Sequence, residues 1–188
     1  MIRHDEIREA VSTIITAIGE DPLREGLVDT PRRVADVYEE FCSGIGQDPS
    51  EVLATSYEEA HHEAVILRSV SFVSLCEHHF LPFFGTAHMG YLPKGRVIGV
   101  SKLARALDIL CRRPQLQERL TRQLADCIFD AVEPVAVTVF LSAEHTCMTL
   151  RGIKSSGSKL VTSSARGEPS AKEELKRELY AIIGEGLT

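Results

Sequence analysis

The sequence contains no apolar run that approaches the length of about 20 residues needed to cross a bilayer. Its first residues, MIRHDEIREAV, are charged and lack the apolar segment of a secretory signal. We therefore expect a cytoplasmic protein that has no membrane partner. A disulfide framework is not expected either, because five cysteines, an odd number between residues 42 and 147, fit reduced thiols or metal ligands better.

Several common nucleotide-binding and hydrolytic signatures are also missing. There is no GxGxxG motif, and nothing in the sequence suggests a Ser/His/Asp triad. Residues 152–159 superficially resemble a P-loop, but the lysine and serine stand in the wrong order and no apolar helix follows at once. These absences exclude the usual phosphate-binding loops.

The composition is that of an ordinary globular protein, with 44% hydrophobic and 26% charged residues in a chain of 188. The formal net charge is −6, yet eight basic and only two acidic residues lie between Lys94 and Arg122. A local basic cluster on an acidic protein indicates a compact anionic ligand rather than a nucleic acid. For any single residue of the cluster, a solvated helix face is the alternative interpretation.

Hydrophobic spacing divides the chain into two regions. Helices are predicted over residues 5–19, from Thr30-Pro31 onward and after Asp48-Pro49. The texture becomes β-rich from Ala64 onward. We therefore expect an N-terminal helical region over residues 1–55 and a second domain, of mixed strands and helices, over residues 56–188.

The second region is expected to run strand, strand, helix, helix, strand, strand, which indicates an α+β fold. Strands are predicted at 64–75, 83–92, 135–141 and 145–151, and helices are predicted to open at Ser101 and Pro114. A Ser/Gly/Thr-rich stretch covers 155–167, and a charged helix follows from about Ser170 to Ile183.

The segment CEHH holds the densest group of metal-binding side chains. A cysteine and a histidine separated by two residues, Cys76 and His79, form a half-site for zinc when they lie on a turn between strands. His145 and Cys147 form the second half, because residues two apart on a strand share a face. The pair of half-sites favours a metal site over ordinary structural histidines.

Two coordination arrangements remain open at this point. A closed set of four ligands would make a structural site. Three ligands, Cys76, His79 and Cys147, would leave a position for water, as a catalytic zinc requires. His78 and His145 would then be free to donate or accept protons. Small buried hydrophobes are the preferred interpretation of the other cysteines, Cys42, Cys111 and Cys127.

A second group of residues fits an anionic ligand. Ser101 opens a helix whose N-terminal N–H groups favour an anion, and Lys102 and Arg105 lie three apart on one face. Glu118 either accepts hydrogen bonds from a purine or forms an intrahelical ion pair of little value. Arg151, at the end of the predicted strand that carries Cys147, adds a further cation on the side of the metal site.

Four strings, in this order, resemble the GTP cyclohydrolase I family: SLCEHHFLPFFGTAHMGYLP, VIGVSKLARAL, RRPQLQERLTRQLA and EHTCMTLRG. The likeness runs from about Asp21 to about Ser164, and DPLREGLVDTPRRVADVY resembles the family's N-terminal helical signature. The resemblance implies a tunnelling fold (ββααββ), an antiparallel sheet with helices on one face, behind an N-terminal helical extension. It also implies a homodecamer of two pentamers with sites at subunit interfaces.

The resemblance further implies zinc-dependent hydrolysis of GTP at C8, with formate release and rearrangement to 7,8-dihydroneopterin triphosphate for folate or tetrahydropterin biosynthesis. The implied zinc ligands are Cys76, His79 and Cys147, and the implied proton-transfer residues are His78 and His145. The other implied roles are guanine binding by Glu118 with Gln117 beside it, triphosphate binding by Lys102, Arg105, Arg151 and Arg33, and a catalytic contact of Ser101.

Three features depart from the family pattern. Asp36 stands where a basic residue usually follows the TPxRVA motif, and Val73 replaces a frequent tyrosine. The segment after Ser164 lacks an expected aromatic residue. One alternative is therefore a diverged paralogue that stops at the ring-opened formamidopyrimidine or serves a specialised purine-derived pathway. Another is a non-enzymatic oligomer with structural zinc or a bound nucleotide.

Overall fold

The computed structural model describes residues 2–184, which divide into two compact units between Ser43 and Gly44. The first unit holds two helices that pack on each other, α1 (His4–Ala17) and α2 (Thr30–Phe41). Asp29 rather than Thr30 occupies the N-cap position of α2, with Pro31 in its first turn as predicted.

The short helix α3 (Pro49–Leu53) begins where the sequence predicts it. The side chain of Asp48 accepts a hydrogen bond from the N–H of Ser50 and caps the helix. Leu53 is fully buried, and α3 packs on α4 and α5 of the second unit. Its contacts therefore lie in the second unit, although the expected range 1–55 groups it with the N-terminal helices.

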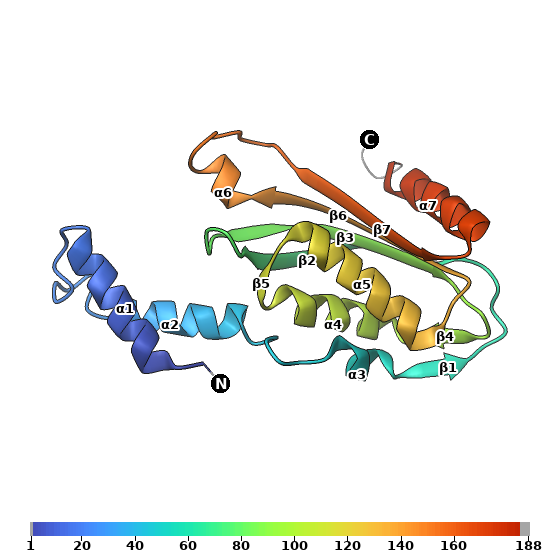
Figure 1. The fold of residues 1–188 in the computed structure, drawn as a ribbon, viewed down its shortest axis with the longest axis horizontal. Coiled ribbons are helices and arrows are strands. Elements are labelled where there is room, and N and C mark those ends of the chain that lie inside the picture. The colour runs from blue at the N-terminus through green and yellow to red at the C-terminus, as the bar shows by residue number, and fades with distance from the viewer. Residues whose placement is uncertain (1, 185–188) are drawn as a thin grey trace. The chain divides into compact units, whose positions relative to one another are not determined.

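A five-stranded sheet in the order β5-β2-β3-β6-β7 forms the middle of the second unit (Figure 1). Its pairs are antiparallel except for the short β5, which runs parallel to β2. Two further strands, β1 and β4, pair in a separate sheet. The strands are β1 (Ser56–Glu58), β2 (Val65–Cys76), β3 (Pro82–Leu92), β4 (Arg96–Ile98), β5 (Pro114–Gln115), β6 (Ala136–His145) and β7 (Leu160–Gly167).

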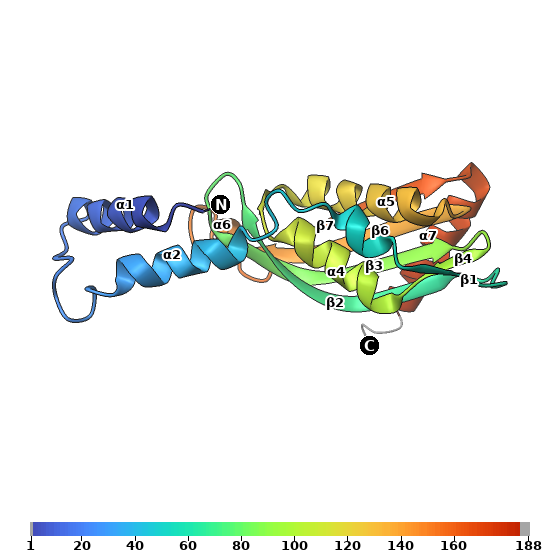
Figure 2. The same cartoon turned by 90° about the horizontal axis from the view of Figure 1, so that it is seen from below.

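Two helices, α4 (Val100–Cys111) and α5 (Gln117–Val132), pack side by side on one face of this sheet (Figure 2). Their apolar stripes meet the inward residues of the strands in one core, in which Leu107 and Leu124 are almost completely buried. The predicted ββααββ order and antiparallel sheet are therefore confirmed. Among the described residues, no helix has the length and apolar character needed to span a membrane.

The C-terminal helix α7 (Pro169–Gly184) packs on the other face of the sheet (Figure 1). Successive strand residues point to opposite faces, so Met89 belongs to the α4–α5 core while His88 faces α7's side. The ring of Phe140 lies edge-on between His88 and Tyr180 of α7, with centroid distances of 5.9 and 5.5 Å. This helix adds a layer beyond the ββααββ motif.

The last strand of the sheet is not the one predicted at 145–151, and that prediction is wrong. β6 ends at His145, and a short helix, α6 (Thr146–Thr149), follows. Pro82 of β3 stands next in the register and has no N–H to continue the ladder. Its carbonyl accepts the hydroxyl of Thr146 at 2.6 Å instead. The pairing strand is β7, which lies within the Ser/Gly/Thr-rich stretch 155–167, where no strand was predicted.

The two central helices also begin differently from the prediction. Gly99 is the N-cap residue of α4, so Ser101 lies inside the first turn rather than capping it. Pro114 belongs to β5 and does not open α5, which begins at Gln117. The reason is that Gln115 pairs with Cys76 at the edge of the sheet, which keeps this segment extended.

Candidate metal centre and active site

Cys76, His79 and Cys147 come together at one end of the sheet. Cys76 ends β2, His79 lies in the turn before β3, and Cys147 lies in α6. One potential ligand atom from each lies within 4.8 Å of the others, and Cys76 Sγ is 3.9 Å from His79 Nδ1. Tetrahedral zinc, with bonds of about 2.3 Å to sulfur and 2.0–2.1 Å to nitrogen, needs ligand separations of about 3.5–3.8 Å. The three side chains therefore fit such an ion after small movements.

The turn that carries Cys76 and His79 is closed by backbone hydrogen bonds. The N–H of Phe80 donates to the carbonyl of Cys76 at 2.9 Å, and the N–H of Cys76 donates to Leu81 at 2.9 Å. Phe80 has a φ of 53°, in the left-handed region that ends a helical turn. Because residues three apart in such a turn share a side, both ligands face Cys147.

Without a cation between them, the negatively charged thiolates of Cys76 and Cys147 would repel each other. Burial raises the pKa of the Cys147 thiol, and the adjacent Cys76 raises this pKa further, while Arg151 lowers it. A bound cation reverses this effect because it stabilises both thiolates. The donor set and its electrostatics therefore fit a resident metal ion.

The remaining cysteines take no part in this group. Cys111 is almost completely buried, and burial raises its pKa. Cys127 and Cys42 are half-buried, and burial raises the pKa of Cys127 to about 11. All three are free thiols, with the packing character expected of small hydrophobes.

His145 is held in a defined orientation beside this metal-binding group. Its ring stacks on Phe83 at a centroid distance of 4.4 Å and an interplanar angle of 5°. Its Nε2 lies 2.8 Å from Oε1 of Gln117. The amide nitrogen of Gln117 donates to the carbonyls of Leu141 and Leu160, which orients Oε1 toward the histidine. Burial lowers the pKa of His145, and the nearby Glu118 carboxylate partly opposes this shift.

Three more predicted residues lie at the same end of the second unit. His78 is exposed in the ligand turn, with its ring centroid 6.2 Å from that of His79. Glu118 is exposed in the first turn of α5 and is close enough to act on the pKa of His145. Arg151 follows α6 and acts on the pKa of Cys147 in the same way.

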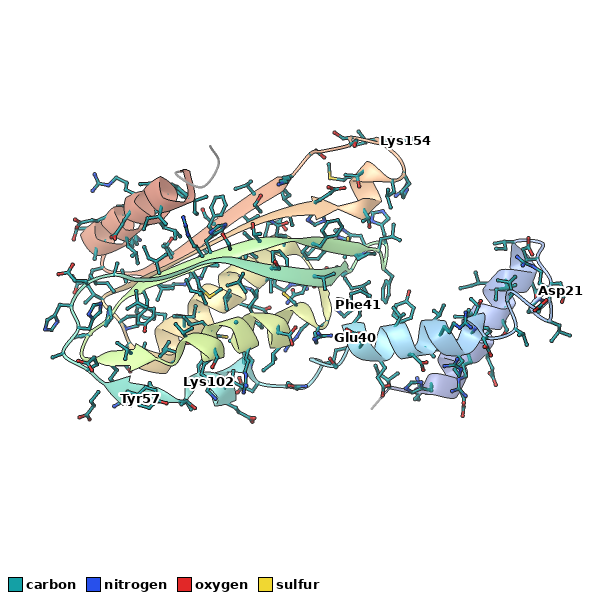
Figure 3. The ribbon with its side chains drawn as sticks, turned by 180° about the vertical axis from the view of Figure 1, so that it is seen from behind. Asp21, Glu40, Phe41, Tyr57, Lys102 and Lys154 are labelled. Atoms are coloured by element: carbon teal, nitrogen blue, oxygen red, sulfur yellow. The ribbon has the colours of Figure 1, made fainter. Side chains whose placement is uncertain are left out.

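Ser101 and Lys102 lie in the first turn of α4, at the end of the helix away from Cys76 and Cys147, and Arg105 lies near the middle of the helix. The C-terminal end of α4 is the one near the metal-binding group, since Ser74 Oγ donates to the carbonyl of Cys111 at 2.7 Å. At 1.5 Å per residue, the helix separates Ser101 from Cys111 by about 15 Å. Figure 3 shows Lys102 near Tyr57, well away from the loop of Lys154 that follows α6. Within one chain, Ser101 and Lys102 are therefore not brought to Cys76 and Cys147.

Arg33 lies in the first unit, where its guanidinium is 3.3 Å from the carboxylate of Asp29. Asp36, the departure from the family pattern, pairs with Arg32 at 3.0 Å on the exposed surface of α2. Arg33 and Asp36 therefore both take part in short-range ion pairs within their own helix.

Sequence reasoning missed an ion pair between two of its own motifs. Arg119 of α5 binds Glu77 of the CEHH turn, and its hydrogen bonds hold the pKa of that carboxyl below its usual range. The sequence offered only two hints: Glu77 is the one acidic residue of the CEHH motif, and Arg119 follows Glu118 without an expected role. Residues 42 positions apart give no spacing rule, so the pair could not be inferred.

Comparison with known proteins identifies the chain's class. The sequence profile of the GTP cyclohydrolase I family matches residues 7–184, and the chain belongs to this family. The expected resemblance, and the expectation of an enzyme, are thus confirmed.

Two relatives named GTP cyclohydrolase 1 match almost the whole chain. GTP cyclohydrolase 1 of Halalkalibacterium halodurans is 50% identical over 183 residues, which cover 97% of each chain. GTP cyclohydrolase 1 of Dehalococcoides mccartyi is 51% identical over 185 residues, or 97% of this chain and 98% of the relative. The crystal structure of the apo archaeosine synthase QueF-Like covers 56% of this chain and 94% of its own, with 18% identity and a TM-score of 0.45.

Proposed function

We propose that the protein is a cytoplasmic, zinc-dependent GTP cyclohydrolase. It hydrolyses GTP at C8, releases formate and rearranges the product to 7,8-dihydroneopterin triphosphate for folate or tetrahydropterin biosynthesis. The observation that carries the proposal is the Cys76–His79–Cys147 group with the oriented His145 beside it. Relatives named GTP cyclohydrolase 1 at 50% identity support the choice of substrate.

Zinc is the proposed metal because two thiolates and one imidazole suit it well. Among the described residues, no fourth Cys, His, Asp or Glu joins the three ligands, which supports the arrangement with an open position. When bound, zinc supplies Lewis acidity that makes water a nucleophile near neutral pH. A purely structural site would not need this opening.

Side chains around the ligands would move protons and orient the base. His145 is the main proton-transfer residue: its lowered pKa favours the neutral ring at neutral pH, and Phe83 and Gln117 fix its direction. His78, exposed on the ligand turn, is the second. Glu118 accepts hydrogen bonds from the guanine N–H and amino groups. The side-chain amide of Gln117 already forms hydrogen bonds within the chain. Glu118 is therefore the main guanine-binding residue, and Gln117 has a supporting role next to it.

The triphosphate would be bound by cations from more than one copy of the chain. Arg151 lies at the metal-binding end, while Ser101 and Lys102 lie in the first turn of α4 and Arg105 near its middle. This separation supports a homo-oligomer in which a neighbouring copy completes each site, and a decamer of two pentamers is the assembly that the family resemblance implies. Arg33 is proposed as a further phosphate contact once its pair with Asp29 opens.

Product analysis tests the activity. Zinc-loaded protein incubated with GTP is expected to yield formate and a pterin that fluoresces after oxidation, and His145→Ala is expected to abolish both while GTP still binds. A product that retains the formyl carbon would instead identify the diverged hydrolase. No product from zinc-loaded oligomer would leave only the non-enzymatic alternative.

A further inference from the structure

An arginine of α5 binds the one carboxylate inside the metal-ligand turn. Nη1 of Arg119 lies 2.5 Å from Oε2 of Glu77, and Nη2 lies 3.1 Å from Oε1. Both carboxylate oxygens are therefore engaged, and the side chains are only 36% and 30% exposed. A bidentate pair of this kind fixes direction as well as distance.

Part of this turn lies open to solvent. The side chains of His78 and His79 are exposed, so burial contributes little to their order. Beyond the turn's internal bonds, the backbone N–H of Glu77 donates to the carbonyl of Gln115 at 3.1 Å. Gln115 is itself buried, and its amide donates to the carbonyl of Leu110 and to Gln123 of α5. The turn is thus tied to the helical layer at Glu77.

We propose that Arg119 is a positioning residue of the metal centre: through Glu77 it holds the Cys76–His79 turn in the geometry that binds the ion. Arg119 itself is not one of the three potential ligands. Without the pair, the exposed turn would have to be ordered when the metal binds, at a cost in conformational entropy. Groups that orient metal ligands typically change metal affinity by about 10- to 100-fold when they are removed. This inference rests on the proposed function only in requiring that the site binds metal.

Simple electrostatics and positioning make opposite predictions for one variant. Arg119→Gln removes a positive charge and leaves Glu77 negative, so a purely electrostatic effect would strengthen cation binding. Glu77→Gln removes a negative charge and would weaken it. If positioning dominates, both variants weaken metal binding, and the double variant is no worse than either single one because the pair acts as a unit.

The test is a Co²⁺ titration of the metal-free full-length protein in competition with a chromophoric chelator, with thiolate-to-cobalt charge-transfer absorption as the signature of the site. Arg119→Gln and Glu77→Gln are each expected to weaken binding by about 10-fold or more. The matched control is Arg122→Gln on the same helix, whose guanidinium is 3.8 Å from Asp126 and which should bind as the wild type does.

Wild-type affinity in Arg119→Gln, or additive losses in the double variant, would overturn the positioning role. If Arg119→Gln does not fold, Arg119→Lys decides, because lysine keeps the charge but not the bidentate geometry and should still weaken binding. Absence of the charge-transfer band in the wild type and in Arg122→Gln would overturn the metal site itself. A wild-type band with unchanged Arg119 variants would overturn only the positioning role.

Discussion

A buried amide, together with the stacked ring of Phe83, orients His145. The side chain of Gln117 is 1% exposed, and its nitrogen faces carbonyl oxygens while its oxygen faces the histidine ring. This arrangement requires Nε2 of His145 to carry the proton, since the amide oxygen can only accept. The ring therefore keeps Nδ1 for proton exchange outside this bond.

Gln117→Glu is the most specific substitution at this position, because it replaces only the side-chain NH2 group by an oxygen and leaves the side-chain volume almost unchanged. It replaces the donor that faces Leu141 and Leu160 with an oxygen, so buried acceptors lose their partner. We expect the free energy of unfolding to fall by about 1–3 kcal/mol and kcat to fall more than KM rises. Urea unfolding and steady-state kinetics check this, and an unchanged unfolding midpoint would contradict the assigned amide orientation.

His88 is a second histidine whose environment sets a pH dependence. It is 7% exposed beneath α7, and its Nδ1 accepts the N–H of Ser69 at 3.3 Å. Burial lowers the pKa of His88, and the nearby positive charge of Arg68 lowers it further. The folded state therefore resists a proton that the unfolded chain accepts.

The sign of the effect follows from linkage. The stability that His88 contributes is complete above the unfolded pKa of about 6.5 and is lost as the pH falls toward the lower folded value. We expect the wild type to lose more stability between pH 7.5 and pH 5 than His88→Gln, whose amide oxygen can still accept from Ser69. Chemical unfolding at both pH values measures this, and equal losses would refute it.

At the scale of elements, the first turn of α5 supports both halves of the site. Gln117 reaches His145 at the end of β6, and Arg119 reaches Glu77 in the turn between β2 and β3. These two segments lie far apart in the sequence, so one helical turn links the metal-ligand turn to the histidine. The position of α5 on the sheet therefore also sets the geometry of the site.

A side-chain hydrogen bond from Thr146 to Pro82 accompanies the change from β6 to α6. Thr146→Val removes the hydroxyl that donates to Pro82 and should destabilise the protein by about 1 kcal/mol. Thr149→Val is the matched control, because the buried Thr149 hydroxyl has no partner among the described groups and its loss should be neutral or stabilising. Thermal unfolding compares the two, and equal effects would contradict the role of the Thr146 bond.

Local patterns predicted most of the elements but not those that depend on long-range pairing. The spacing of Cys76 and His79 was sufficient to predict a half-site, because both lie in one turn. The strand β7 escaped prediction because its consecutive Thr162, Ser163 and Ser164 are typical of a loop until β6 lies beside them. The Glu77–Arg119 pair and the distance of Lys102 from Cys76 depend on how helices cross the sheet, which no local pattern contains.

At the scale of the whole molecule, the residues of the proposed site come from distant parts of the second unit. The metal ligands lie at one end of this unit, and Lys102 lies in the first turn of α4, at the end of the helix away from them. If neighbouring copies complete each site, two inactive variants can complement each other. Complementation therefore distinguishes a site formed between subunits from a site formed by one chain alone.

Mixed oligomers of Cys147→Ala and Lys102→Ala are the direct test of that arrangement. Each variant alone should be inactive or nearly so, and co-assembled copies should regain a fraction of wild-type activity, because some interfaces carry both native residues. GTP turnover after co-expression measures this, with the double variant co-assembled with itself as the control. No recovery in oligomers shown by mass to be mixed would place the site within one chain.

The account depends most on an open position in the metal coordination. A crystal structure of the zinc-loaded protein should show one ion bound by Cys76 and Cys147 at about 2.3 Å and by His79 at about 2.0–2.1 Å, with solvent as the fourth ligand. A fourth protein side chain on the ion, or no ion in zinc-replete crystals, would contradict a catalytic metal and leave a structural site or none.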